Sequence, residues 1–281
     1  MKEIKRILVG IDIFAKSNNV LKRAITVARE NNATLFVVYA VDTPWLSIPS
    51  YFGSEDVQVD LKGIKKKIEK KIQVLNNKDE VPYIIIIKEG SPHDILSYEA
   101  KLLKVDMMII GANTTGKKNV LGSTAEKMVH RSRLPVLIVK NAVKDTYKNI
   151  VAPTDFQTQS KQSILLAKIL FKSATIKPVH SFETIYLEGP YTTMGQDMTP
   201  YNEAAKVCAK RDIKKLTKNL SIEKGKVLDG TLNNKKALVS YINKGTFDLT
   251  VIGSAGLHAH LGSMASSIIR DSKTDVLVFV P

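Results

Sequence analysis

Two aspartates and two glycine-containing loops are the residues whose type and spacing could bind a ligand. Asp12 and Asp155 each follow a short apolar run, and Gly111 and Gly253 each open a loop that leads to a Gly-Ser pair. Glycine leaves backbone N–H groups unhindered, and a helix that begins at such a pair carries partial positive charge at its first turn. This combination suits a phosphate group. The same glycines could instead only make tight strand-to-helix turns, and the pattern leaves both interpretations open.

Catalysis finds little support among the side chains. The sequence has no Gly-x-Ser-x-Gly nucleophile motif and no His and Cys cluster at metal-ligand spacing. His258 and His260 form a loop pair without an identifiable third ligand. The loop after Gly111 resembles a P-loop but has Lys118 where a hydroxyl would hold magnesium. We therefore expect no catalytic residue, no metal site and no enzyme, with slow ATP hydrolysis left open.

The composition is that of an ordinary globular protein. Of the 281 residues, 44% are apolar and 25% are charged, which excludes disorder, collagen and coiled coil as the main architecture. No apolar stretch approaches the ~18–20 residues of a membrane helix, and Asp12 interrupts the first apolar run too early for a signal peptide. The single cysteine, Cys208, fits a reducing compartment. We expect a cytoplasmic protein without membrane contact, in which Cys208 lies half-buried on a helix.

The net charge of +15 is divided evenly along the chain, with +8 in residues 1–142 and +7 in the remainder. An even division argues against a basic nucleic-acid-binding tail. The lysines at positions 65–67 alternate with Ile64, Ile68 and Ile72 at helical spacing. They are therefore interpreted as the solvent face of an amphipathic helix, and a nucleic-acid partner is not expected.

The sequence contains an internal repeat. The segment that begins at Ile7 matches the segment that begins at Ile150, and the last third of each half also matches. The residues that could bind a ligand coincide in pairs: Asp12 with Asp155, Gly111 with Gly253, and Gly122-Ser123 with Gly262-Ser263. Each half is therefore predicted to be one copy of a domain, with boundaries at 1–142 and 143–281.

Strands and helices alternate within each copy. Continuous apolar runs predict strands that are covered on both faces, and in the first copy they occupy residues 7–11, 34–41, 83–88, 106–111 and 136–139. Helical periodicity fills the intervals, and Ser91, Pro92 and Asp94 have the types and spacing of a capped helix start. The alternation predicts an α/β fold in which each copy is a mostly parallel five-stranded sheet flanked by helices.

Three motifs resemble the universal stress protein family. They are Val-Ala-Pro-Thr-Asp-Phe at 151–156, Gly-Ser-Pro at 90–92, and Gly-x-x-Gly…Gly-Ser followed by Pro-Val-Leu-x-Val. The resemblance covers nearly the whole chain twice, as in a tandem member with two Rossmann-like domains. It implies a cytoplasmic stress-response protein, and one branch of the family binds ATP while another does not.

Carried over by position, the resemblance implies a nucleotide site in each copy. Asp12 and Asp155 would meet the adenosine side, while Ala40 and Ser181 would line the adenine. Ribose and phosphates would be surrounded by Gly111, Thr114, Gly122, Ser123 and Thr124 in the first copy, and by Gly253, Gly256, Gly262, Ser263 and Met264 in the second. ATP, with magnesium bound to it, is the cofactor that the resemblance implies.

Both copies depart from the ATP-binding pattern, which has nine residues between its second glycine and Gly-Ser. Thr114 replaces the second glycine of the first copy, and seven residues follow it before Gly122. Five residues separate Gly256 from Gly262 in the second copy. Two functions therefore stay open: an ATP-binding sensor or signalling module, for which the first copy is slightly favoured, and an interaction scaffold that binds no nucleotide.

The last strand of each copy is an unbroken apolar run, at 136–139 and 276–280. An edge strand of this kind needs cover. Members of the family commonly pair through this strand, so we expect the two halves to form an intramolecular pseudo-dimer. A homodimer is the alternative, and the protein partner is not identifiable from the sequence.

Overall fold

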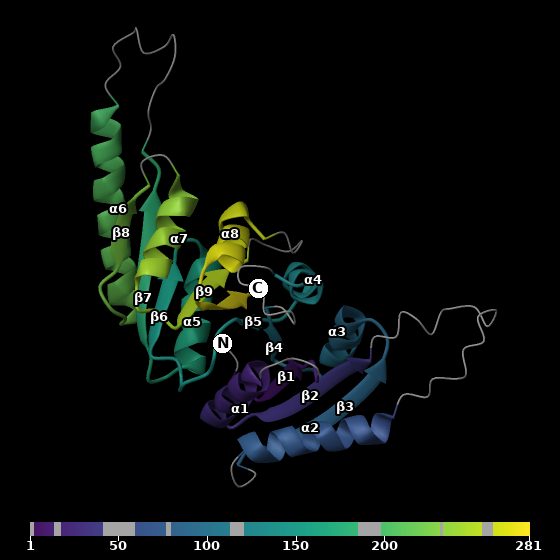
Figure 1. The fold of residues 1–281 in the computed structure, drawn as a ribbon. Coiled ribbons are helices and arrows are strands. Elements are labelled where there is room, and N and C mark those ends of the chain that lie inside the picture. Colours follow the sequence, from purple (N-terminus) through teal and green to yellow (C-terminus); the bar gives the residue numbers. More distant parts are fainter. Residues whose placement is uncertain are drawn as a thin grey trace, which may run out of the picture. The chain divides into compact units, whose positions relative to one another are not determined.

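The computed structural model describes residues 3–13, 18–41, 60–76, 80–112, 121–184, 198–230, 233–254 and 261–281 (Figure 1). The chain separates into two compact units, Lys2–Thr146 and Tyr147–Pro281. We refer to them as the first unit and the second unit.

The first unit is a five-stranded sheet with helices between the strands. Its strands are β1 (Arg6–Gly10), β2 (Thr34–Val41), β3 (Tyr83–Glu89), β4 (Met107–Gly111) and β5 (Val136–Val139), in the order β3-β2-β1-β4-β5. Neighbouring strands pair in parallel throughout. Its described helices are α1 (Asn19–Asn31), α2 (Leu61–Leu75), α3 (Pro92–Leu102) and α4 (Ser123–Arg131).

The second unit repeats this topology. Its strands are β6 (Asn149–Pro153), β7 (Thr175–Phe182), β8 (Lys226–Asp229), β9 (Leu249–Gly253) and β10 (Asp275–Phe279), in the order β10-β9-β6-β7-β8. The pairings are again parallel. Its described helices are α5 (Thr158–Leu170), α6 (Thr199–Leu220), α7 (Asn234–Lys244) and α8 (Ser263–Asp271). The prediction of two Rossmann-like α/β units is therefore confirmed.

The direction of winding changes at the first strand of each unit. From β1 the chain proceeds to β2 and β3 on one side, and then crosses to β4 and β5 on the other. β6 lies between β7 and β9 in the same way. Ligands of open parallel sheets bind beyond the carboxyl ends of the strands at such a point. Asp12 and Gly111 lie at the carboxyl ends of β1 and β4 in the first unit. Asp155 and Gly253 lie at the carboxyl ends of β6 and β9 in the second.

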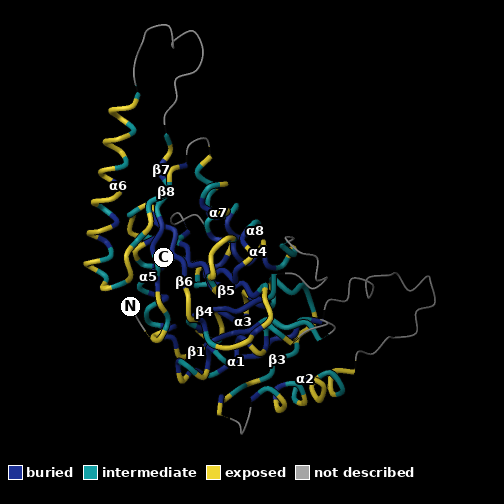
Figure 2. The backbone as a smooth tube through the Cα atoms, turned by 60° about the vertical axis from the view of Figure 1, so that its left-hand side comes forward, coloured by how far each residue is buried: buried dark blue, intermediate teal, exposed yellow. Residues whose placement is uncertain are grey.

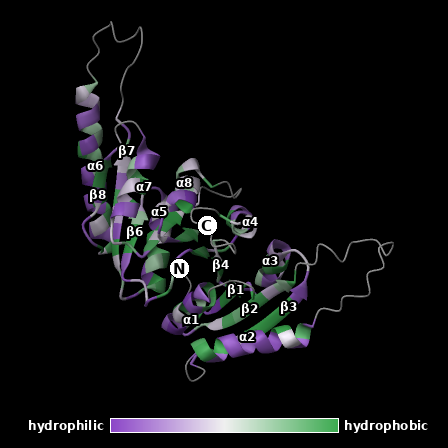
Figure 3. Cartoon of the chain, viewed as in Figure 1, coloured by the Kyte–Doolittle hydropathy of each residue, from purple (hydrophilic) through white to green (hydrophobic). Residues whose placement is uncertain are grey.

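The core of each unit lies along its central strands. Ile7, Leu8 and Val9 of β1 are fully buried, and Figure 2 shows buried backbone through the middle of each sheet. On α2 only Ile68 and Ile72 are buried, because the lysines occupy the solvent side of the helix. The purple outer side of α2 in Figure 3 is this lysine face, which confirms the amphipathic helix that the spacing predicts.

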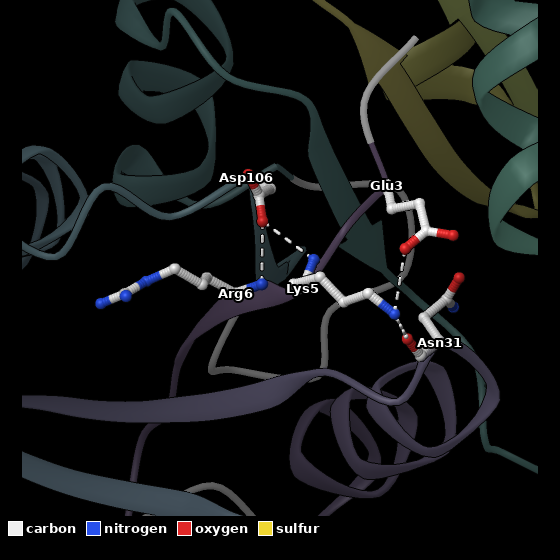
Figure 4. Close-up of polar contacts among 5 residues, drawn as sticks. All are labelled: Glu3, Lys5, Arg6, Asn31 and Asp106. Carbon is white, nitrogen blue, oxygen red and sulfur yellow. Dashed lines mark hydrogen bonds and ion pairs between the residues drawn. The ribbon is translucent and has the colours of Figure 1, made fainter.

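A carboxylate holds the amino end of β1 (Figure 4). Asp106 Oδ2 accepts hydrogen bonds of 2.9 Å from the backbone N–H groups of both Lys5 and Arg6. The Lys5 ammonium meets Glu3 Oε2 at 3.2 Å and donates to Asn31 O at 3.4 Å. The residue that precedes β4 therefore fixes the start of its neighbour in the sheet.

The second unit contains the same arrangement. Asp248, which precedes β9, accepts through Oδ2 from the N–H groups of Lys148 and Asn149, both at 2.9 Å. Asp106 and Asp248 are thus equivalent in the two copies, and both act on the fold at the end of the sheet opposite to the ligand crevice. The sequence analysis did not identify this pair.

The start of α3 differs from the capping box that its sequence predicts. Ser91 is the N-cap residue and Pro92 begins the helix, as expected, but the Ser91 side chain makes no capping bond. Ser91 Oγ lies 2.8 Å from His93 Nδ1, and Asp94 Oδ1 lies 3.0 Å from His93 Nε2. The predicted capping box is wrong because the side chains of Ser91 and Asp94 both contact the ring of His93.

Cys208 was expected to be half-buried, but it is exposed on α6. Ala209, Ile213 and Leu216 are the buried residues of this 22-residue helix. Cys208 lies outside that stripe.

Candidate functional site

A cavity of about 510 Å³ lies in the second unit at the carboxyl ends of β6, β7 and β9, beside the first turn of α8. Small-molecule sites usually enclose about 300–1,000 Å³. Five residues that the sequence assigns to a nucleotide site line this cavity: Asp155, Ser181, Gly253, Gly262 and Met264. The structure thus brings together residues that are distant in the sequence, at the position where the topology predicts a ligand.

Asp155 shapes the wall of the cavity through the start of α5. Its Oδ1 accepts from Gln157 N at 3.0 Å and from Ser160 Oγ at 2.8 Å. The hydroxyl of Ser160 also lies 3.0 Å from Thr154 Oγ1, which accepts from Phe156 N. This network holds the strand-to-helix turn after β6, so Asp155 has a structural task besides any contact with a ligand.

His180, which the sequence analysis did not assign to the site, also lines the cavity. Its Nδ1 lies 2.7 Å from Thr154 O. Because a carbonyl oxygen only accepts, Nδ1 carries the proton in this hydrogen bond, and Nε2 is left for another contact. The ring lies against Phe156, with centroids 4.5 Å apart, and Phe156 has a φ of 65° in the left-handed region.

Ser181 is bound to the start of α7. Its Oγ lies 2.9 Å from the side-chain amide of Asn234. With the amide nitrogen facing the strand, Asn234 donates to Ser181 Oγ and, at 2.8 Å, to Phe182 O, while its oxygen accepts from Glu183 N. Ser181 therefore presents a fixed hydroxyl at the end of β7.

Gly253 is required by packing. A Cβ at this position would lie 2.6 Å from the backbone carbon and oxygen of Gln159, at the start of α5. The glycine lets β9 and α5 approach each other. This contact supports the interpretation that Gly253 has a structural role in the turn. Gly256 lies outside the described residues.

Gly262 differs from Gly253 in both respects. It is the N-cap of α8 with φ −56° and ψ 154°, which any residue can adopt, and a Cβ there would meet nothing within 4 Å. Neither backbone conformation nor packing in the described structure requires a glycine here. Open space at the wall of a cavity, at the start of a helix, is what a phosphate group would need.

The first turn of α8 supplies donors at this place. The first intrahelical bond runs from Ser266 N to Gly262 O, at 3.0 Å. The N–H groups of Ser263, Met264 and Ala265 precede it and therefore have no partner within the helix. With the helix dipole, they suit an anion. Ser263 itself is exposed.

The equivalent strand ends of the first unit place Asp12, Ala40 and Gly111 as the repeat predicts. Asp12 is half-buried just after β1, Ala40 is the last but one residue of β2, and Gly111 ends β4. Burial raises the pKa of the Tyr39 hydroxyl, and the nearby charge of Asp12 raises it further. Asp12 and Tyr39 are therefore neighbours at this edge. Thr114 lies outside the described residues.

The helix start of the first unit is more closed. Gly122 is the N-cap of α4, and Ser123 and Thr124 form its first turn. The Gly122 N–H donates to Ala112 O at 2.6 Å, which joins the two ends of the loop. One of the amides that the resemblance assigns to phosphate binding is therefore already used.

Neither a metal-binding cluster nor a membrane-spanning helix occurs among the described residues. No group of three or more His, Cys, Asp or Glu side chains among them could hold a metal ion. Within the same residues, no helix combines the length and the apolar character that a membrane span requires.

Both halves of the chain match the model of the universal stress protein family, over residues 3–140 and 146–280. The chain belongs to the universal stress protein family. It is a tandem member, with one domain of the family in each half. This confirms the resemblance that the motifs carry.

Relatives with established names cover one domain. Universal stress protein MJ0531 of Methanocaldococcus jannaschii is 30% identical over 146 residues, which are 50% of this chain and 85% of that protein. The stress response protein NhaX of Bacillus subtilis is 26% identical over 161 residues, covering 48% of this chain and 97% of that protein.

Some solved structures resemble the chain over nearly its whole length. A functionally unknown protein of Pseudomonas aeruginosa, PA1789, has a TM-score of 0.72 at 17% identity and covers 99% of this chain and 93% of its own. A universal stress protein of Archaeoglobus fulgidus has a TM-score of 0.62 at 18% identity, with 98% and 97% covered. At these identities the likeness shows the fold.

Proposed function

We propose that this protein acts in a stress response in the cytoplasm, where it binds an adenine nucleotide and serves as a sensor or signalling module. The observation that carries the proposal is the cavity of the second unit, which opens onto Gly262 at the start of α8. Membership of the universal stress protein family, and the name of the stress response protein of Bacillus subtilis, support the stress-response part.

The residues present fit a nucleotide. The N–H groups of the first turn of α8 can donate to phosphate oxygens, and the polar groups of Ser181 and His180 lie at the end of β7, where the resemblance places the adenine. A bound nucleotide would bring its own magnesium.

We propose binding without turnover. Asp155, the carboxylate in the wall of the cavity, is engaged by Gln157 and Ser160 in holding α5. It is therefore poorly placed to serve as a general base. Phosphate release from ATP by the purified protein, at rates above the uncatalysed background, would contradict this part of the proposal.

The decisive experiment is isothermal titration of the purified protein with ATP, ADP and AMP, together with mass spectrometry of the supernatant after denaturation. Gly262→Val places a branched side chain in the space beside α8 and should abolish binding in the second unit. Gly122→Val makes the same change in the first unit and is the matched control for which unit binds. If both variants bind like the wild type, the phosphate-loop hypothesis is wrong.

An interaction scaffold without nucleotide is the second candidate function. The bond from Gly122 N to Ala112 O favours it for the first unit, because it removes a donor from the implied phosphate site. Wild-type protein that binds no adenine nucleotide at millimolar concentration would make this the better function. The pairing of the two halves through their last strands, the alternative homodimer and the protein partner stay predictions.

A further inference from the structure

We propose that the cavity of the second unit selects a nucleoside monophosphate over a triphosphate, and that Ser254 donates a hydrogen bond to its phosphate. The inference rests on the proposed function and narrows it to one unit and one class of ligand. It also reverses the slight preference that loop length gave to the first unit.

Charge is the first argument. The cavity wall holds the carboxylate of Asp155 and, among the described lining residues, no lysine or arginine. The group that attracts anions is the first turn of α8, equivalent to roughly half a positive charge. One phosphate suits such a site better than three.

Ser254 is the second, independent argument. It directly follows β9, lines the cavity and is 3% exposed. Its Oγ is buried and has no hydrogen-bond partner among the described residues. Buried hydroxyls are nearly always satisfied, so an unpaired one in the wall of a cavity indicates a partner that enters the cavity. A phosphate oxygen at the start of α8 would be such a partner.

The two units differ at this point. The residue equivalent to Ser254 is Ala112, which has no side-chain donor and whose carbonyl accepts from Gly122 N. Within the described structure, the second unit makes no corresponding bond between Gly262 N and Ser254 O. In the first unit the Gly122 N–H is therefore already bound to the backbone, while the second unit has the Ser254 hydroxyl as an additional donor beside the start of α8.

The test compares adenosine, AMP and ATP, the last with and without magnesium, by isothermal titration of the full chain and of Ser254→Ala. We expect AMP to bind at least about tenfold more tightly than either adenosine or ATP. In Ser254→Ala the AMP affinity should fall about 10- to 100-fold, because a hydrogen bond to a charged group is lost. Adenosine affinity should not change.

A structural role for Ser254 predicts that Ser254→Ala lowers the unfolding midpoint of the ligand-free protein. A ligand-binding role predicts an unchanged or higher midpoint, because the hydroxyl that is removed is unpaired in the described structure. Ser266→Ala, which makes the same change on α8 away from the cavity, is the control and should bind AMP like the wild type. Tighter binding of ATP than of AMP would overturn the inference while the proposed function survives, and so would an equal loss of AMP and adenosine affinity in Ser254→Ala. Failure of all three ligands to bind would remove the proposed function itself.

Discussion

The carboxyl group of Glu30 should make the first unit less stable as the pH rises. Glu30 lies in the last turn of α1, and its Oε2 is buried without a hydrogen-bond partner among the described residues. Burial raises its pKa from 4.5 to about 7, while Arg23 opposes the increase and Asp145 adds to it. Because the folded state holds the proton more tightly than the unfolded state, stability is greatest below pH 4.5 and falls as the pH rises through about 7.

The size of the effect follows from the two pKa values. A change from 4.5 to about 7 corresponds to about 3.4 kcal/mol for a fully buried group. Since Glu30 is only about half-buried, solvent screening reduces the expected cost of its charge to about 1–2 kcal/mol. Glu30→Gln removes the charge and keeps the shape, so it should raise the free energy of unfolding by this amount at pH 8.5 and by almost nothing near pH 4.5.

Denaturant unfolding at several pH values measures the difference in free energy of unfolding between the wild type and Glu30→Gln. Hydrogen exchange on α1 assigns the transition to the first unit. Glu89→Gln, at the exposed end of β3, is the control and should change stability little at any pH. A loss of stability in Glu30→Gln at pH 8.5 would refute the reasoning, because it would show that the carboxylate is stabilised by Arg23 more than it is penalised by burial.

Two further changes test the second unit. Tyr147→Phe removes the 2.6 Å hydrogen bond from the Tyr147 hydroxyl to Asp275 Oδ2, and both residues are fully buried. The free energy of unfolding, measured by denaturant titration, should fall by about 1–3 kcal/mol. An unchanged unfolding midpoint would contradict this prediction. Gly253→Ala should cost about 1–3 kcal/mol, because its Cβ would meet the backbone of Gln159, whereas Gly262→Ala should stay within about 0.5 kcal/mol. Equal thermal midpoints for the two alanine variants would count against this distinction.

The fold could be predicted because its signals are repeated and physical. Apolar runs such as 7–11 and 136–139 can be satisfied only by strands covered on both faces, and the repeat presents every such run twice. What escaped prediction depends on a single competing contact. Ser91 has the type and position of a capping residue, but His93, two positions on, takes its hydroxyl. Spacing alone does not say which of two nearby hydrogen-bond partners a serine side chain will bind.

The candidate site was predictable in its place and not in its chemistry. The topology and the repeat bring Asp155, Gly253 and Gly262 to one cavity, as the sequence indicates. The two glycines look alike in sequence. A side chain at Gly253 would collide with the backbone of α5, whereas a Cβ at Gly262 would meet nothing within 4 Å. Only the packing of α5 against β9 separates them. Ser254 was missed because a serine after a strand is common, although the contrast with Ala112 in the repeat was a signal that could have found it.

Duplication makes such a contrast informative. Two copies that kept the same topology and the same Asp106 and Asp248 contacts at the amino ends of their strands differ at the carboxyl ends, where ligands bind. In the first unit the Gly122 N–H donates to Ala112 O, and in the second the buried hydroxyl of Ser254 has no hydrogen-bond partner among the described residues. Since fold alone does not determine function, likeness at one end of the sheet and difference at the other are what the proposed division of tasks between the two units requires. On the proposed function, the second unit would bind the ligand and the first would be free to bind a partner.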